Sequence, residues 1–275
     1  MKTFRALSLA VAVAASLVAP SAFAGAVHDS SLFTTVLPAN DDDSTGPIGL
    51  GFTAYINSTN YTQTYVNNNG NVTFDGPRST FTPSAISSGA FGPIIAAFFA
   101  DVDTRATGSL PVTYGAATMG GKNVFGVNYI HVGVFGAQPI FNSFQMILTD
   151  RSDVSAGDFD IQFNYDDIIW ESGTASGAPP GGLGGTSALV GYWTSATSNA
   201  TLSGSLVNGA LINGGPNALI SHSLNSDTLG QYNFQVRGGV VVEPPTGNVP
   251  EPSVLALVGL ALAGLGFSAR KKRAA

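Results

Sequence analysis

No stretch between residues 47 and 242 repeats its apolar residues with the period of an amphipathic helix. Several short runs instead alternate apolar with polar side chains, which places the two sets on opposite faces of an extended strand. Glycine, asparagine and proline interrupt these runs at short intervals, as in proteins built from antiparallel strands. This pattern predicts an all-β fold for residues 47–242, an antiparallel, β-sandwich-like domain.

The individual strands can be placed from the same alternation. In one of the clearest runs, apolar Phe159, Ile161 and Phe163 alternate with polar Asp160 and Gln162. The expected strands lie within residues 51–56, 61–66, 71–74, 92–104, 124–136, 142–151, 157–170, 188–195 and 232–242.

Two connections are also predicted. The runs 61–66 and 71–74 are expected to form a hairpin, with Asn69 and Gly70 in a type I′ turn because both tolerate a positive φ. Residues 172–187 are mostly small, so they predict a mobile loop.

Residues 1–24 have the parts of a secretory signal peptide. Two basic residues precede an apolar helix at 6–19, and Ala22 and Ala24 form the small-residue cleavage site before Gly25. We therefore expect export through the Sec translocase and removal of this signal helix. An N-terminal segment, 25–46, would then precede the β domain.

A second apolar segment covers residues 253–269 and contains no charged side chain. As a helix it would be about 25 Å long, slightly less than the roughly 30 Å hydrocarbon core of a bilayer. It has no polar face, and the basic residues that follow it would stay on the cytoplasmic side of a membrane. These features predict a C-terminal transmembrane helix, and the alternative is a buried core helix.

The residues that flank this helix resemble the PEP-CTERM protein-sorting signal of Gram-negative bacteria. That signal combines a Pro-Glu-Pro motif, a helix rich in glycine and leucine, and a basic cluster. The flanking residues here are Val249, Pro250, Glu251, Pro252, Arg270, Lys271, Lys272 and Arg273. The signal would occupy residues 250–275, after a linker at 243–249.

The resemblance implies recognition by an exosortase, a membrane-embedded transpeptidase, and processing near the Pro-Glu-Pro motif. It also implies a transient stay in the inner membrane, followed by delivery to the outer surface or extracellular matrix. Export of this class is linked to exopolysaccharide and biofilm production. A permanently anchored periplasmic protein is the alternative.

Charge and cysteine content exclude several functions. Residues 25–249 hold five cations and sixteen acids, so the mature chain has a net charge of −11. A surface this acidic repels nucleic acid and other anionic polymers, but it suits divalent cations. The sequence contains no cysteine, which excludes disulfides, zinc–thiolate sites and thiol catalysis.

A second set of residues resembles the nidogen-like (NIDO) extracellular domain. The shared features are a VNNNG hairpin at 66–70, an apolar strand that ends in Asp-x-Asp at 101–103, and a Gly-Tyr-Trp strand at 191–193. Phe99 stands where the family usually has tryptophan. The resemblance implies a β-rich module of adhesive and matrix proteins with no known catalytic mechanism.

This second resemblance covers roughly residues 47–200. The stretch 202–229 has no clear counterpart in the family pattern and reads as an insertion.

Two carboxylates, Asp101 and Asp103, would share one face of an extended strand. Like charges this close need a cation or another partner, and carboxylate oxygens are good ligands for Ca²⁺. They are therefore the candidate calcium ligands, and no other cofactor is expected. The alternatives are neutralisation by Arg105 and capping of loop amides. The acidic run at 41–43 can also meet calcium, but it lies in no known calcium-binding loop motif, so a solvated loop is expected.

Other side chains give little support for catalysis. No metal-binding histidine spacing, nucleophile elbow or nucleotide-binding loop is present in the sequence. Asp166, Asp167 and Glu171 can be read as the carboxylates of a glycosidase, but only their acidity supports this. Tyr192 and Trp193 can stack on sugars, although such residues more often fill a core. We therefore expect a structural or adhesive protein that is not an enzyme, and a secreted polysaccharide hydrolase is the alternative.

Overall fold

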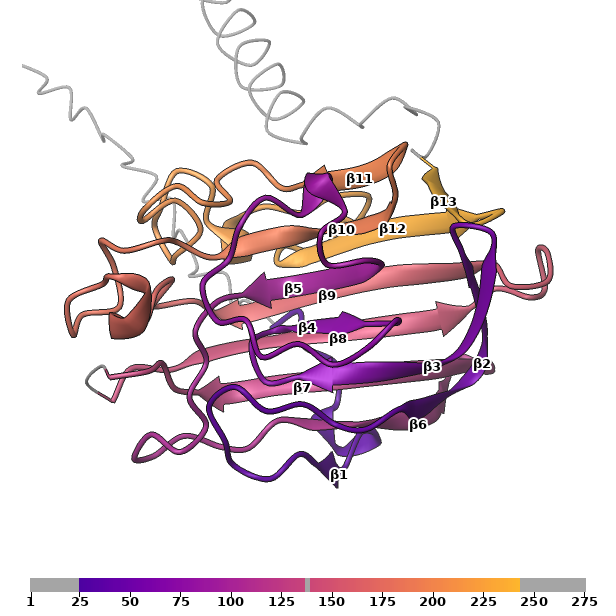
Figure 1. The fold of residues 1–275 in the computed structure, drawn as a ribbon. Coiled ribbons are helices and arrows are strands. Elements are labelled where there is room, and N and C mark those ends of the chain that lie inside the picture. Colours follow the sequence, from indigo (N-terminus) through magenta and orange to yellow (C-terminus); the bar gives the residue numbers. More distant parts are fainter. Residues whose placement is uncertain (1–24, 137–138, 243–275) are drawn as a thin grey trace, which may run out of the picture.

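The computed structural model describes residues 25–136 and 139–242, which form two stacked β-sheets (Figure 1). The strands of the larger sheet, in spatial order, are β1 (Thr35–Val36), β6 (Thr113–Met119), β7 (Lys122–Val132), β8 (Asn142–Asp150), β9 (Phe159–Asp167), β12 (Gln231–Arg237) and β13 (Val240–Val242). The strands of the smaller sheet are β11 (Ser198–Thr201), β10 (Leu189–Ser195), β5 (Ile94–Phe99), β4 (Asn71–Thr73), β3 (Thr59–Asn67) and β2 (Ile48–Ile56).

All neighbouring strands in both sheets pair antiparallel. Helical structure within 25–136 and 139–242 is limited to four short 3₁₀ turns, η1 (Ser30–Leu32), η2 (Ile86–Ser88), η3 (Thr174–Ser176) and η4 (Leu219–Ser221). The predicted all-β architecture of two antiparallel sheets is therefore confirmed.

The main core lies between the sheets and is rich in aromatic side chains. Phe98 of β5 contacts Phe144 of β8 and Trp170, with ring centroids 5.3 and 5.6 Å away, respectively. Tyr129 of β7 stacks on Phe144 at 4.6 Å, and all four side chains are fully buried. Each large aromatic removes roughly 150–250 Å² of surface from water, so this cluster supplies much of the apolar burial.

Two core tyrosines also join the sheets by hydrogen bonds. The Tyr129 hydroxyl donates to the carbonyl of Asn67 at 2.8 Å, and the Tyr165 hydroxyl of β9 donates to the carbonyl of Ala97 in β5 at 2.6 Å. Burial raises the pKa of both hydroxyls, because a buried phenolate would lose its hydration. Both groups therefore stay protonated donors and fix the position of one sheet on the other.

The first part of the N-terminal segment, residues 25–34, packs on the outer face of the larger sheet. Phe33 is fully buried against Val124 and Ile147. Its ring fills the space above Gly126, where an added Cβ would lie 2.0 Å from the ring. The segment therefore gives the sheet a second apolar cluster on its outer side.

A row of buried amides, Asn128, Gln145 and Asn164, lies beneath the same segment. Gln145 Nε2 donates to Asn128 Oδ1 at 2.8 Å, and Asn164 Nδ2 donates to Gln145 Oε1 at 3.1 Å. The backbone N–H of His28 also donates to Gln145, and the carbonyl of Ser30 accepts from Asn128. Alternation alone places these amides on a solvent face, but the N-terminal segment covers them and satisfies their hydrogen bonds.

The predicted type I′ turn is wrong, although the hairpin itself is confirmed. Asn67 pairs with Asn71, which leaves Asn68, Asn69 and Gly70 as a three-residue loop. A type I′ turn requires a positive φ at both central residues, whereas only Gly70 has one here, at 76°.

The final predicted strand, 232–242, is also divided into two. Gly238 and Gly239 have φ values of 56° and 84° and form the turn between β12 and β13. Strands β1, β6 and β11 were not predicted, because their runs are short or rich in small residues.

The loop 172–187, which the sequence predicts to be mobile, contains η3 and is held by backbone hydrogen bonds. The N–H of Ala178 donates to the carbonyl of Gly173 at 3.1 Å, and that of Thr186 donates to Ser176 at 2.8 Å. These bonds replace the apolar core that the small side chains of this loop cannot form.

Residues 202–229 contribute to the body of the domain. Leu211 and Leu219 are buried in the main core although they lie in turns and η4 rather than in strands. The stretch that the sequence suggested as an insertion therefore contributes to the main core.

Across residues 25–136 and 139–242, no helix is long and apolar enough to cross a membrane. The predicted signal helix at 1–24, the transmembrane helix at 253–269 and the sorting residues around them lie outside the residues that the structure describes.

Candidate metal centre

Three segments that are distant in the sequence lie together in the structure. They are the loop at 40–43, the turn between β3 and β4, and the chain that follows β5. The side-chain amide of Asn68 donates to the carbonyls of Asp41 and Val102. Asn69 Nδ2 donates to Asp42 Oδ1 at 2.8 Å, and its Oδ1 accepts from the N–H of Val102 at 2.9 Å. The two asparagines therefore tie the loop at 40–43 to the chain that follows β5.

A second set of contacts joins the same two segments directly. Thr104 Oγ1 accepts from the N–H of Asn40 and donates to its carbonyl, both at 2.8 Å. The backbone N–H of Thr104 donates to that carbonyl as well, at 2.9 Å. Both residues are buried, so these bonds are shielded from water and hold the loops in a defined position.

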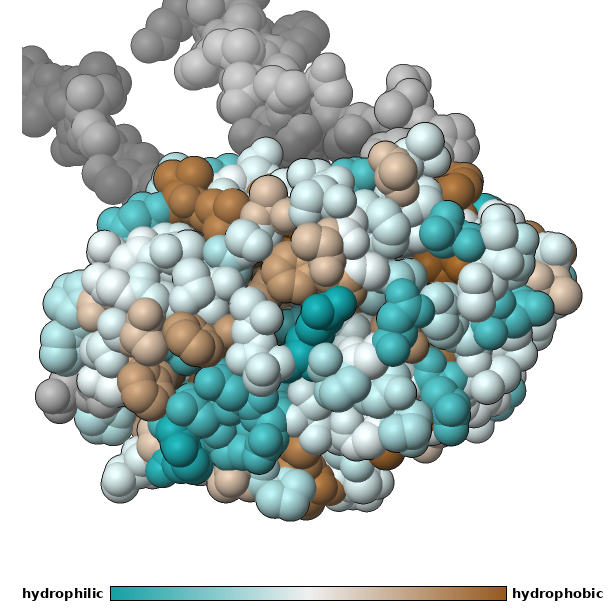
Figure 2. Space-filling view, viewed as in Figure 1, coloured by the Kyte–Doolittle hydropathy of each residue, from teal (hydrophilic) through white to brown (hydrophobic). Residues whose placement is uncertain are grey.

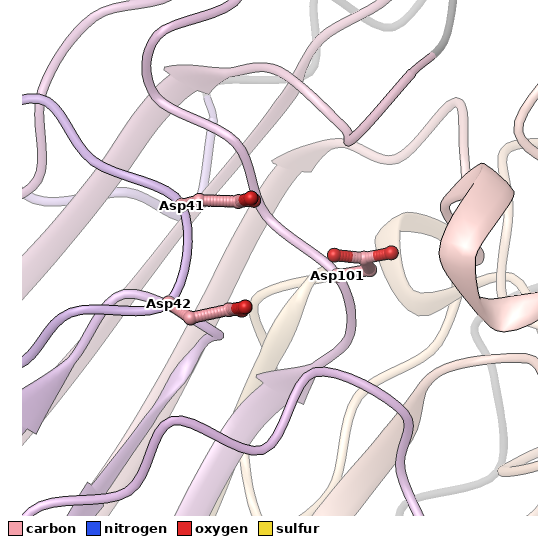
Figure 3. Close-up of side chains that lie close together, drawn as sticks. All are labelled: Asp41, Asp42 and Asp101. Carbon is pink, nitrogen blue, oxygen red and sulfur yellow. The ribbon is translucent and has the colours of Figure 1, made fainter.

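This arrangement brings together the carboxylates of Asp41, Asp42 and Asp101. One oxygen from each lies within 4.8 Å of the other two. Figure 3 shows Asp41 and Asp42 extending in parallel from one loop toward Asp101 on the opposite segment. Asp101 is only 2% exposed, and Asp41 and Asp42 are half-buried.

Burial and mutual repulsion both make ionisation of the cluster unfavourable. Desolvation, with the nearby charges of Asp41, Asp42 and Asp103, raises the pKa of Asp101 to about 7. Desolvation and the neighbouring carboxylates raise the pKa of Asp41 to about 6, although Arg105 opposes this shift. A cation bound beside these carboxyl groups would favour their ionised form.

The sequence suggests Asp103 and Asp101 as joint calcium ligands, but in the structure Asp103 binds Arg105 instead. The Arg105 side chain binds Asp103 through two hydrogen bonds, from Nε at 2.8 Å and from Nη2 at 2.9 Å. Arg105 Nη2 also contacts Asp41 Oδ2 at 2.7 Å. Two carboxylates that were expected to act together therefore have different partners.

The acidic run at 41–43 is not the solvated loop that the sequence suggests. Asp43 is exposed, but Asp41 and Asp42 turn inward toward Asp101. The sequence feature connected with Asp41 and Asp42 is the VNNNG hairpin, because its asparagines bind the acidic run at 41–43. Sequence spacing could not reveal that contact.

The acids considered for a glycosidase are each held by a different partner. Glu171 is fully buried and accepts from the backbone N–H groups of Gly209 and Leu211, both at 2.6 Å. Asp167 accepts from an asparagine side chain, and Asp166 accepts from a backbone N–H of the N-terminal segment. Their observed contacts are those of residues that hold loops in place.

The two aromatic residues considered for sugar stacking are turned toward packed regions. Tyr192 is 6% exposed and packs on Phe234 in the main core, with ring centroids 5.3 Å apart. Trp193 is half-buried, and its ring lies against Gly89. The Tyr192 side chain therefore belongs to the core, whereas Trp193 remains partly exposed.

The cations of the described chain are all engaged by neighbouring groups. Arg105, Lys122, Arg151 and Arg237 form salt bridges, and Arg78 donates to a carbonyl beside the ring of Phe91. The face shown in Figure 2 is largely polar or neutral, with hydrophobic residues in separate patches. Unpaired charge on the domain is therefore mainly negative.

Comparison with known proteins identifies the domain. The family described as NIDO related matches residues 22–216. The chain belongs to the NIDO-related family. A second family, described as the PEP-CTERM protein-sorting motif, matches residues 248–273 of the NIDO-related chain. Both resemblances noted in the sequence are therefore confirmed.

The curated relatives are much longer than this NIDO-related protein. Alpha-tectorin from Homo sapiens is 33% identical over 182 residues, which cover 58% of this chain and 8% of the tectorin. Alpha-tectorin from Gallus gallus is 32% identical with the same coverage. The similarity thus spans less than a tenth of the length of these relatives. No solved structure matches the chain.

The PEP-CTERM motif implies exosortase as the processing partner of the NIDO-related chain, and export to the cell envelope or surface. The carboxylate cluster of Asp41, Asp42 and Asp101 lies within the residues that match the NIDO-related family.

Proposed function

We propose that the protein is a structural or adhesive component of the bacterial cell surface or extracellular matrix. The observation that carries this proposal is the order of the two matches, a NIDO-related domain at 22–216 followed by a PEP-CTERM motif at 248–273. The signal peptide directs the chain to the Sec translocase, and the C-terminal helix holds it in the inner membrane until the exosortase acts. The β domain is then the part that operates outside the cell.

Exopolysaccharide is the partner that we infer for this domain, because sorting by this type of signal is tied to polysaccharide export. The net charge of −11 disfavours direct contact with a strongly anionic polymer. We therefore expect a weakly charged polysaccharide, or one held through divalent cations.

We further propose that the domain has no catalytic activity of its own. The support is the separate engagement of the acids that a polysaccharide hydrolase would use. Glu171 holds two backbone N–H groups, and Asp166 fixes the N-terminal segment. A hydrolase would require such carboxylates to face a common substrate.

Disruption of the sorting motif tests this function in cells. The gene is deleted and restored either as wild type or with Pro250→Ala, Glu251→Ala and Pro252→Ala combined. We expect the variant protein in the matrix fraction to fall at least about tenfold, because the exosortase no longer recognises it. Biofilm mass and retained polysaccharide should fall to the level of the deletion strain.

The chain supplies a matched control close to the motif. Glu243, Pro244 and Pro245 contain the same residue types, so their replacement by alanine should leave matrix delivery unchanged. Normal biofilm mass and polysaccharide retention in the deletion strain would contradict a structural or adhesive role.

A further inference from the structure

We propose that Asp41, Asp42 and Asp101 bind a calcium ion that fastens the N-terminal segment to the loop following β5. This site differs from the Asp101–Asp103 pair that the sequence suggests, because Asp103 is held by Arg105. It concerns the domain itself, so it stands or falls independently of the function proposed above.

The spacing of the three carboxylates fits calcium. Because the three oxygens lie within 4.8 Å of one another, one point exists within about 2.8 Å of all of them. Calcium–oxygen distances are about 2.3–2.6 Å, so shifts of a few tenths of an ångström would complete the contacts. Magnesium binds at about 2.0–2.1 Å and demands nearly ideal octahedral geometry, so it fits this spacing less well.

The independent observation that points to a ligand is the state of Asp101. Its side chain is 2% exposed, and neither of its carboxylate oxygens accepts a hydrogen bond from the described part of the chain. One of these oxygens points toward Asp41 and Asp42 (Figure 3). Asp41 Oδ1 is likewise buried without a partner. Buried polar atoms in folded proteins are nearly always satisfied, and an unsatisfied carboxylate oxygen carries a particularly large desolvation cost. The unpaired Asp101 carboxylate that faces Asp41 and Asp42 therefore indicates a missing cation.

Among residues 25–136 and 139–242, no cationic side chain fills this role for Asp101. Arg105 is the nearest candidate, but its contacts go to Asp103 and to Oδ2 of Asp41. On its other side, Asp101 lies against Gly173, where an added Cβ would be 2.2 Å from Asp101 Oδ2. The close backbone leaves no room for another side chain there, so an ion would approach from the side of Asp41 and Asp42.

The asparagines of the β3–β4 turn make the site rigid. Asn68 and Asn69 hydrogen-bond to both acidic segments. The hydrogen bonds between Asn40 and Thr104 join the same two segments directly. Calcium would add a further link between the same segments. The strength of this link would depend on the calcium concentration outside the cell. Extracellular calcium modules bind with dissociation constants of about 0.1–1 mM, and this is the range we expect.

The test measures calcium binding to the full chain in detergent after treatment with a chelator. Titration with CaCl₂ followed by calorimetry should show binding with a dissociation constant of about 0.1–1 mM, and about 10 mM CaCl₂ should raise Tm by about 3–10 °C. Asp101→Asn, which keeps the shape of the side chain, should weaken binding at least tenfold and remove the rise in Tm. Asp42→Asn supplies a second, less buried variant with the same expected loss.

A matched control separates this site from the general negative charge of the domain. Asp227→Asn removes the same charge from an exposed position outside the cluster, so its response to CaCl₂ should equal that of the wild type. Absence of both heat and a Tm shift in the wild type would overturn the proposal. So would an unchanged calcium response in Asp101→Asn and Asp42→Asn, or an equal rise in Tm with MgCl₂.

Discussion

Gly70→Ala is expected to lower the free energy of unfolding by at least about 3 kcal/mol and to reduce the yield of folded protein sharply. The backbone of Gly70 has a φ of 76°, which costs an alanine about 1–2 kcal/mol. A Cβ at this position would also lie 1.8 Å from the carbonyl oxygen of Phe98, so β5 and the hairpin must separate. Thermal unfolding followed by circular dichroism measures the change.

The effect of Gly70→Ala should extend to the candidate metal centre. Gly70 directly follows Asn68 and Asn69, the residues that hold the two acidic loops. Gly76→Ala is the matched control, because no atom lies within 4 Å of an added Cβ there. A Tm for Gly70→Ala within about 2 °C of that for Gly76→Ala would contradict the close approach of the hairpin to β5.

Trp170→Ala is expected to lower the free energy of unfolding by about 3–5 kcal/mol. The indole is fully buried and meets Phe98 edge-on, with ring centroids 5.6 Å apart. Its Nε1 donates to the carbonyl of Val132 at 3.3 Å, so the substitution leaves a cavity and an unpaired acceptor. Urea unfolding monitored by the fluorescence of the remaining tryptophan measures the loss.

The other tryptophan provides the comparison for Trp170. Trp193 is half-buried and packs on a smaller cluster around Ile86 and Phe91. Trp193→Ala, monitored by the fluorescence of Trp170, should therefore lower the free energy of unfolding by less than half as much as Trp170→Ala. Equal losses of unfolding free energy in the two variants would contradict a core centred between β5, β8 and Trp170.

The sequence predicts strands well where alternation is strong and where pairing partners are close in the chain. The runs around Phe144 and Phe159 became the neighbouring strands β8 and β9, and the apolar run after Pro93 became the fully buried β5. Strand β6 was not predicted, because Gly115 and the alanines of this strand have a low propensity for β structure. It forms a strand because β7 pairs with it over seven residues.

The candidate metal centre was only partly predictable, for a physical reason. Asp101 could be recognised from its position after a buried strand, but its partners Asp41 and Asp42 lie about 60 residues away in the sequence. Their approach depends on the amide side chains of Asn68 and Asn69, which local patterns assign only to a turn. Local spacing instead favoured Asp103, whose nearer partner is Arg105.

The central claim is that a NIDO-related domain is exported and then separated from its C-terminal sorting segment. Intact-mass spectrometry of the protein from wild-type cells and from cells without the exosortase tests this claim most directly. We expect a chain that begins at Gly25 and ends near Pro250–Pro252 in the extracellular matrix of wild-type cells. In cells without the exosortase, the same chain should keep residues 253–275 and remain with the membrane. Full-length protein with both termini uncut, folded in the cytosol of wild-type cells, would contradict the account.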